Sequence, residues 1–281
     1  MTPAPDRFAE LMAREEPAID LARACLLIAQ DAYPGLDVEG YLGEIERLAA
    51  RLRGRLAEGD DAEERIAALS EFLFADLGYT GNADNYYDPR NSYLNEVLDR
   101  RTGIPLTLSV LYMEIGRRIG LPLEGVSFPG HFLIKLKMPQ GEVVIDPFTG
   151  HSLSREELDE LLLPYKRNRG LLGEFDTPLG LFLQAAPARD VIARMLRNLK
   201  GIYREADKPE RLLEVLNRMR VVAPEAHGEL RERGLLYQRL ECYRAALKDL
   251  ADYSALEPDA PDAEEVRARV LELSALCARL N

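Results

Sequence analysis

The stretch that decides the fold runs from Gly103 to Pro122 and reads GIPLTLSVLYMEIGRRIGLP. Its apolar residues occupy most sides of a helix that would run from about 105 to 119, so we expect a central, buried helix. Two shorter stretches follow, GHFLIKL at 130–136 and VVIDPF at 143–148. They are rich in Val, Ile and Phe and are separated by Pro-Gln-Gly, which predicts the strands of an antiparallel hairpin.

The predicted hairpin carries one histidine and one aspartate. If MPQG forms a four-residue loop, Lys137 pairs with Glu142. Because side chains alternate along a strand, His131 and Asp146 then share one face, where the carboxylate can orient the imidazole. The alternative is that Asp146 only caps a turn and His131 only follows a glycine at the start of a strand.

A helix, a histidine on one strand and an aspartate on the next are the layout of a Cys-His-Asp hydrolase or transferase, but the nucleophile is missing here. A thiol at a helix N-terminus would be activated by the helix dipole. Residue 105 is a proline, which suits a helix start because the N–H it lacks would have no partner there. Thr107 and Ser109 point in other directions, and Cys25 lies on an apolar helical stripe typical of a core.

A dense polar group, NSYLNEVLDRR, precedes the central helix. It predicts a short helix capped by Asn91 or Ser92. Two interpretations remain open for its polar side chains. Asn91, Asn95 and Glu96 could line a binding pocket beside the central helix, or Asn91 could cap the short helix while Asn95 bonds a loop backbone.

The two ends of the chain are predicted to be helical. Amphipathic periodicity covers residues 6–78. After a linker candidate at 165–188, two segments repeat at an offset of 34 residues, and matched pairs such as Leu216 with Leu250 and Pro224 with Pro258 mark the period. This spacing is typical of tetratricopeptide repeats, here two helix pairs and a final capping helix.

Charge and cysteine usage exclude several classes of protein. The formal net charge is −12, and residues from Leu181 onward carry 17 basic and 17 acidic side chains, so the first 180 residues hold the whole excess. An acidic chain argues against a nucleic-acid-binding surface or an anionic-membrane surface. Cys25, Cys242 and Cys277 are far apart, which favours a reducing compartment over a disulfide framework. With no apolar segment long enough to span a bilayer, we expect a cytoplasmic protein.

No cofactor or metal is expected from the sequence. His151 and His227 have no partners at metal-ligand spacing, and neither GxGxxG nor GxxxxGK[ST] occurs.

The segment NSYLNEVLDRRTGIPLTLSVLYMEIGRRIGLPLEGVSFPGHFLIKL, followed by VVIDPFTG, resembles the SirB-type transglutaminase-like family of bacteria. YPGLDVEGYLGEIERLA is similar to the helical lead-in of that family, and the resemblance covers nearly the whole chain. It implies a mostly helical α+β fold: a papain/transglutaminase-like domain with a small antiparallel sheet, then an all-α tetratricopeptide-like repeat. The expected domains are 1–180, with the lead-in at 6–78 and the core at 91–150, and 187–281.

The resemblance also implies acyl transfer through a thioester, with His131 and Asp146 at the histidine and aspartate positions and Pro105 at the nucleophile position. We therefore predict a vestigial or repurposed pair in a non-catalytic protein that binds a protein partner through residues 187–281. The alternative is a hydrolase or amide-cleaving enzyme that uses His131 and Asp146 with Ser109, Thr107 or a water molecule.

Overall fold

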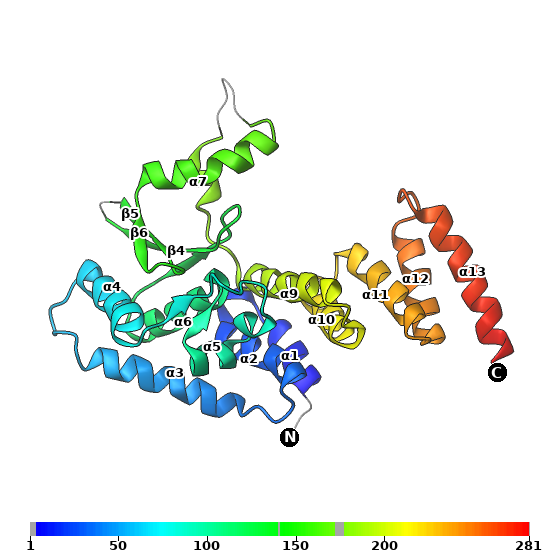
Figure 1. Cartoon of the computed structure of the whole chain (residues 1–281), viewed down its shortest axis with the longest axis horizontal. Coiled ribbons are helices and arrows are strands. Elements are labelled where there is room, and N and C mark those ends of the chain that lie inside the picture. The colour runs from blue at the N-terminus through cyan, green and yellow to red at the C-terminus, as the bar shows by residue number, and fades with distance from the viewer. Residues whose placement is uncertain (1–3, 140, 172–176, 281) are drawn as a thin grey trace. The chain divides into compact units, whose positions relative to one another are not determined.

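The computed structural model describes residues 4–139, 141–171 and 177–280 (Figure 1). It divides into two compact units, one ending at Met195 and the other beginning at Leu196. The division falls inside a helix, whereas the sequence analysis placed the boundary between residues 180 and 187. Part of the predicted linker, residues 172–176, lies outside the described residues.

The first unit begins with the predicted helical lead-in. Its elements are α1 (Ala4–Met12), the 3-10 turn η1 (Glu16–Ala18), α2 (Leu21–Ala32), α3 (Val38–Arg53), α4 (Ala62–Ser70) and the π-helical turn η2 (Glu71–Asp76). An aspartate caps each of three helices: Asp20 for α2, Asp37 for α3 and Asp61 for α4. Their side-chain oxygens accept backbone N–H groups that would otherwise have no partner.

The central helix is α6 (Pro105–Arg118), as predicted, and it is buried on most sides. Before it come β1 (Thr80–Gly81), the 3-10 turn η3 (Pro89–Ser92), α5 (Leu94–Arg100) and β2 (Thr102–Gly103). The predicted cap of α5 is wrong, because its N-cap is Tyr93, with no side-chain bond. Pro89 starts a 3-10 turn capped by Asp88, so Asn91 and Ser92 lie within that turn instead.

A four-stranded antiparallel sheet follows in the order β3 (Glu124–Val126), β4 (Leu133–Met138), β5 (Gly141–Asp146) and β6 (His151–Leu153). Lys137 pairs with Glu142, as predicted. The loop is shorter than the expected four residues, because pairing continues to Met138 and Gly141.

Helices cover the sheet, which Figure 1 shows between α6 and α7 (Arg155–Asn168). α7 starts with a capping box of Ser154 and Glu157. Side chains from β3, β4 and β5 form one core cluster with α7 and α8 (Leu179–Phe182). Leu133 and Val144 are both in this cluster, so these residues of adjacent strands lie on the same face of the sheet.

The second unit consists of stacked helices. The helices of this region are α9 (Ala188–Glu205), which the unit boundary divides, α10 (Pro209–Val222), α11 (His227–Arg239), α12 (Tyr243–Leu256) and α13 (Ala263–Arg279). Figure 1 shows α11, α12 and α13 stacked in succession, and Leu230, Leu250 and Val266 pack between them. The predicted two helix pairs and final helix are confirmed.

Arg189, in the first turn of α9, binds the segment that follows α1. Its guanidinium donates to the carbonyl oxygens of Met12 (2.8 Å) and Arg14 (2.5 Å) and to the carboxylate of Glu16 (2.6 Å). The segment after α1 is therefore held by a residue from much later in the sequence.

Candidate functional site

The start of α6 is built for packing. Pro105 is its first residue and is buried. The Thr107 hydroxyl donates to the carbonyl of Asn91 at 2.7 Å and accepts the N–H of Ile104 at 3.2 Å. A Cβ on Gly103 would lie 2.8 Å from the Thr107 Oγ1, so only glycine fits there without a shift. The Thr107 hydroxyl therefore connects the first turn of α6 to the 3-10 turn that contains Asn91.

Ser109, one turn further on, is fully buried. Among the described residues its Oγ has no hydrogen-bond partner. A catalytic serine needs a base within hydrogen-bond reach. Ser109 has none.

The predicted pair lies at the ends of the hairpin strands. His131 is partly exposed and precedes β4, where its N–H donates to the carbonyl of Phe128 at 3.1 Å. Asp146 ends β5, and its Oδ1 accepts the N–H of Phe148 at 2.8 Å. Within the described part of the chain, no hydrogen bond joins the His131 imidazole to the Asp146 carboxylate. The carboxylate caps the turn that follows β5.

This turn is held against the loop that leads to α6. A Cβ on Gly81 would lie 2.1 Å from the Phe148 ring, and the Tyr86 ring centroid is 6.4 Å from that of Phe148. Gly81 pairs with Gly103, two residues before Pro105. The end of the hairpin therefore contacts β1, which pairs with β2 just before α6, and the rings of Tyr86 and Phe148 lie near each other there.

None of the three cysteines lies on α6 or on the hairpin. Cys25 is fully buried in α2, and burial, with a smaller contribution from the Glu114 carboxylate, raises the pKa of its thiol. Cys242 is exposed and Cys277 is buried, and both lie in the second unit. No three His, Cys, Asp or Glu side chains in the described ranges are arranged to hold a metal ion.

The three predicted binding residues are not brought together. Asn91 is fully buried, accepts from the Asn82 side chain at 3.1 Å and donates to the carbonyls of Asn85 (2.8 Å) and Tyr86 (3.2 Å). It therefore does not cap α5 but holds the loop at 82–86.

Asn95 and Glu96 instead line an open cleft of about 620 Å³. The sequence analysis missed Asp37, Tyr41 and Asp99, which line it with them. The spacing of Asn95, Glu96 and Asp99 at i, i+1 and i+4 on one short helix was the available signal. The Oδ1 of Asn95 has no hydrogen-bond partner among the described residues.

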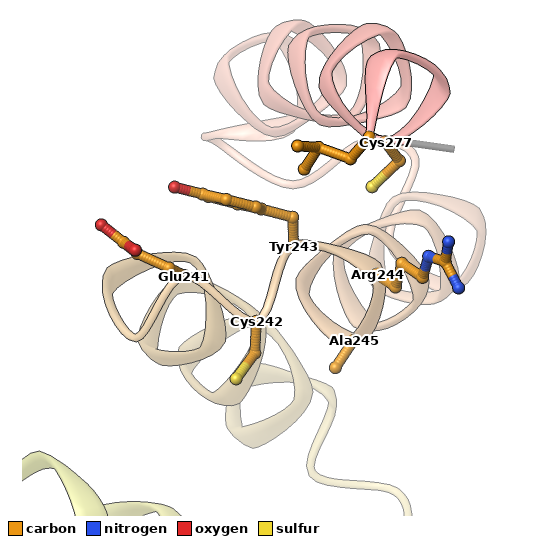
Figure 2. Close-up of a pocket in the computed structure, with 7 residues that line it drawn as sticks. Glu241, Cys242, Tyr243, Arg244, Ala245 and Cys277 are labelled. Atoms are coloured by element: carbon orange, nitrogen blue, oxygen red, sulfur yellow. The ribbon is translucent and has the colours of Figure 1, made fainter.

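The second unit contains a separate cavity of about 380 Å³, between the α11–α12 turn and the end of α13. In Figure 2 the Tyr243 side chain extends between the turn that carries Cys242 and the helix that carries Cys277. The lining of this cavity is mainly apolar and includes Leu280.

Comparison with known protein families agrees with this architecture. Residues 39–197 match the model of the transglutaminase-like superfamily. The chain belongs to the transglutaminase-like superfamily. Residues 199–270 match a tetratricopeptide-repeat model.

Bacterial relatives cover most of the chain. A UPF0162 protein of Xylella fastidiosa (strain Temecula1) is 40% identical over 92% of each chain, and UPF0162 protein YchA of Escherichia coli K12 is 30% identical over 88% of each. Protein SirB1 of Salmonella typhimurium is 28% identical over 81% of this chain and 82% of its own. The predicted resemblance to the SirB-type family is confirmed.

A solved structure of menin overlaps 95% of this chain and 73% of its own, with a TM-score of 0.43 and 12% identity. That likeness is too weak to support an inference. None of the helices in the described ranges has the length and apolar character needed to cross a bilayer.

Proposed function

We propose that this chain is a non-catalytic transglutaminase-like protein that binds a protein partner. The start of α6 carries the proposal. By the family resemblance Pro105 falls at the nucleophile position, the Thr107 hydroxyl is used in the helix cap, and Ser109 is buried. Removing the nucleophile from such a constellation lowers the rate by several orders of magnitude.

The geometry gives less support to an amide-cleaving enzyme built on His131 and Asp146. Such an enzyme needs a hydroxyl, thiol or positioned water next to the imidazole. Among the described residues, no hydroxyl or thiol hydrogen-bonds to His131, and Asp146 uses one carboxylate oxygen to cap a turn.

Turnover of a glutamine-containing peptide with an amine tests the absence of catalysis. We expect ammonia release at the rate measured without protein, unchanged in His131→Ala. His227→Ala is the control, because His227 is also a histidine but lies on α11 in the second unit and not on the sheet. Turnover that is present in the wild type, lost in His131→Ala and kept in His227→Ala would overturn the proposal.

Tetratricopeptide repeats generally mediate contacts between proteins, and this supports the second unit as the partner-binding part. A cleft of about 400 Å³ lies over α10, α11 and α12, lined by Arg220, Lys248 and Leu256 among others. Leu256 is 50% exposed. An exposed leucine between charged side chains is the kind of anchor that a protein partner would cover.

The experiment compares two leucine variants of the full chain. A partner captured by the wild type is purified, and its affinity is measured for wild type, Leu256→Gln and Leu163→Gln. Leu163 on α7 is the control, because it is also an exposed leucine, at 38%. We expect Leu256→Gln to weaken binding by about tenfold and Leu163→Gln to leave it unchanged. Equal affinities for all three proteins would count against the repeat as the docking surface.

A further inference from the structure

The cleft that contains Asn95 and Glu96 has a composition of its own. It is formed by the connection between α2 and α3, by the first turn of α3 and by one side of α5. We call it the acidic cleft. Its polar and aromatic lining residues are Tyr33, Asp37, Tyr41, Asn95, Glu96 and Asp99. Among the described residues that line it, none is a lysine or an arginine.

The carboxylates of the acidic cleft are only partly used by the protein. Asp37 accepts a backbone N–H of α3 through Oδ1, and Asp99 accepts the Tyr41 hydroxyl at 2.8 Å through Oδ2. Burial, the hydrogen bond to Asp99 and the charges of Glu44 and Glu96 raise the pKa of Tyr41 to about 12. The charges of Asp99 and Glu96 therefore both act on the Tyr41 hydroxyl.

The nearby arginines also interact with Asp88, which does not line the cleft. Arg100 lies 4.0 Å from Glu96, but it also lies 4.0 Å from the buried carboxylate of Asp88. Arg90 pairs with Asp88 at 2.7 Å. Because Arg100 is shared between two carboxylates and lies at the limit of an ion pair with each, Glu96 can still accept a donor from a ligand.

Asn95 is the second observation that points to a ligand. Its side chain lines the cleft and is 3% exposed, and its Oδ1 has no hydrogen-bond partner among the described residues. Buried polar atoms without a partner are rare in folded proteins, and each one calls for an explanation. A donor group that enters the cleft would supply the missing partner.

We propose that the acidic cleft binds the guanidinium group of an arginine side chain from a protein partner. A guanidinium is planar and carries five N–H donors in a fixed fork, which can reach a carboxylate and an amide oxygen at the same time. It also stacks on aromatic rings, which Tyr33 and Tyr41 provide. An ammonium group is a compact point charge and uses this spread of acceptors less well. In taking the ligand to be part of a protein, this inference rests on the proposed function.

The test titrates the full chain with three probes and follows binding by NMR. The probes are N-acetyl-arginine amide, its neutral isostere N-acetyl-citrulline amide, and N-acetyl-lysine amide. We expect the arginine probe to saturate with a Kd of about 1–10 mM and the other two to bind at least about fivefold more weakly. Raising the salt from about 20 mM to about 300 mM should weaken arginine binding several-fold.

Variants locate the site. Asp99→Asn keeps an acceptor for Tyr41 but removes a charge, and we expect it to weaken arginine binding about tenfold. Asn95→Leu, with a similar volume, should also weaken binding. Glu160→Gln is the matched control, because Glu160 is exposed on α7 outside the cleft. Circular dichroism establishes that each variant is folded.

Three results would overturn the inference: citrulline or lysine probes that bind as tightly as arginine, no saturation by about 50 mM arginine probe, or equal losses in Asp99→Asn and Glu160→Gln. The proposed function has its own readouts. Failure of the arginine titration with a retained effect of Leu256→Gln refutes the acidic cleft alone. Turnover lost in His131→Ala refutes the proposed function whatever the titration shows.

Discussion

Two hydroxyls on α6 should have opposite effects on stability when removed. Thr107→Val keeps the side-chain shape and deletes the hydroxyl that bonds the carbonyl of Asn91 and the N–H of Ile104. Both of these residues are buried, so two backbone groups lose a partner where water cannot easily replace it. At about 1–2 kcal/mol for each, we expect the free energy of unfolding to fall by about 2–4 kcal/mol.

Ser109→Ala removes a hydroxyl that is fully buried and has no partner among the described residues. The cost of burying that oxygen disappears, and alanine has the higher helix propensity. A small loss of packing offsets part of this gain. We expect a change between zero and about 1 kcal/mol in favour of the variant.

Urea unfolding followed by far-UV circular dichroism measures both variants. With an m-value of about 2 kcal/mol/M, Thr107→Val should lower the midpoint of the first unit by about 1–2 M. A loss of more than about 1 kcal/mol in Ser109→Ala would refute the reasoning, because it would mean that the hydroxyl has a bonding role. So would a neutral Thr107→Val.

Three further predictions concern packing, pH dependence and a buried ion pair. Gly81→Ala should cost about 1–3 kcal/mol, because its Cβ would overlap the Phe148 ring, and Phe148→Ala should relieve most of that cost in a double-mutant cycle; additive losses would contradict it. Burial raises the pKa of the Cys25 thiol, so the unfolded chain releases this proton first, and stability should fall above about pH 8.5 by up to about 1.4 kcal/mol per pH unit. Urea unfolding at several pH values should show a shallower fall in Cys25→Ala, and an identical slope would refute this origin. Asp249→Asn removes the negative charge of the buried Asp249 and leaves one oxygen in place of the two that accept from Arg233 at 2.6 and 2.8 Å. It should cost about 2–3 kcal/mol, with only the urea transition of the second unit shifted.

The sequence predicted the parts of this fold whose signals are local. The start of α6 follows from a proline before an apolar run, and the register between Lys137 and Glu142 follows from strand alternation around a short loop. The capping box of Ser154 and Glu157 is likewise contained within four residues. Each of these patterns needs only a few neighbouring residues to specify a structure.

The roles of the polar side chains could not be predicted, because they depend on contacts between distant segments. Asn91 serves the loop at 82–86, whose path is fixed by β1 pairing with β2. Tyr41 and Asp99 meet across 58 positions of sequence. Helical periodicity places each residue on a face of its own helix, but it does not say which other helix approaches that face.

The contacts of Arg189 can form only late in the synthesis of this chain. Its bonds to Glu16 span 173 positions, so the segment after α1 leaves the ribosome long before the side chain that fastens it. At about 5–20 residues per second, the wait is roughly 10–35 seconds. During that time the carbonyl groups of Met12 and Arg14 lack the guanidinium that binds them in the folded protein. A nascent chain stalled before residue 189 should therefore expose this segment to proteases and chaperones, and the finished protein should protect it.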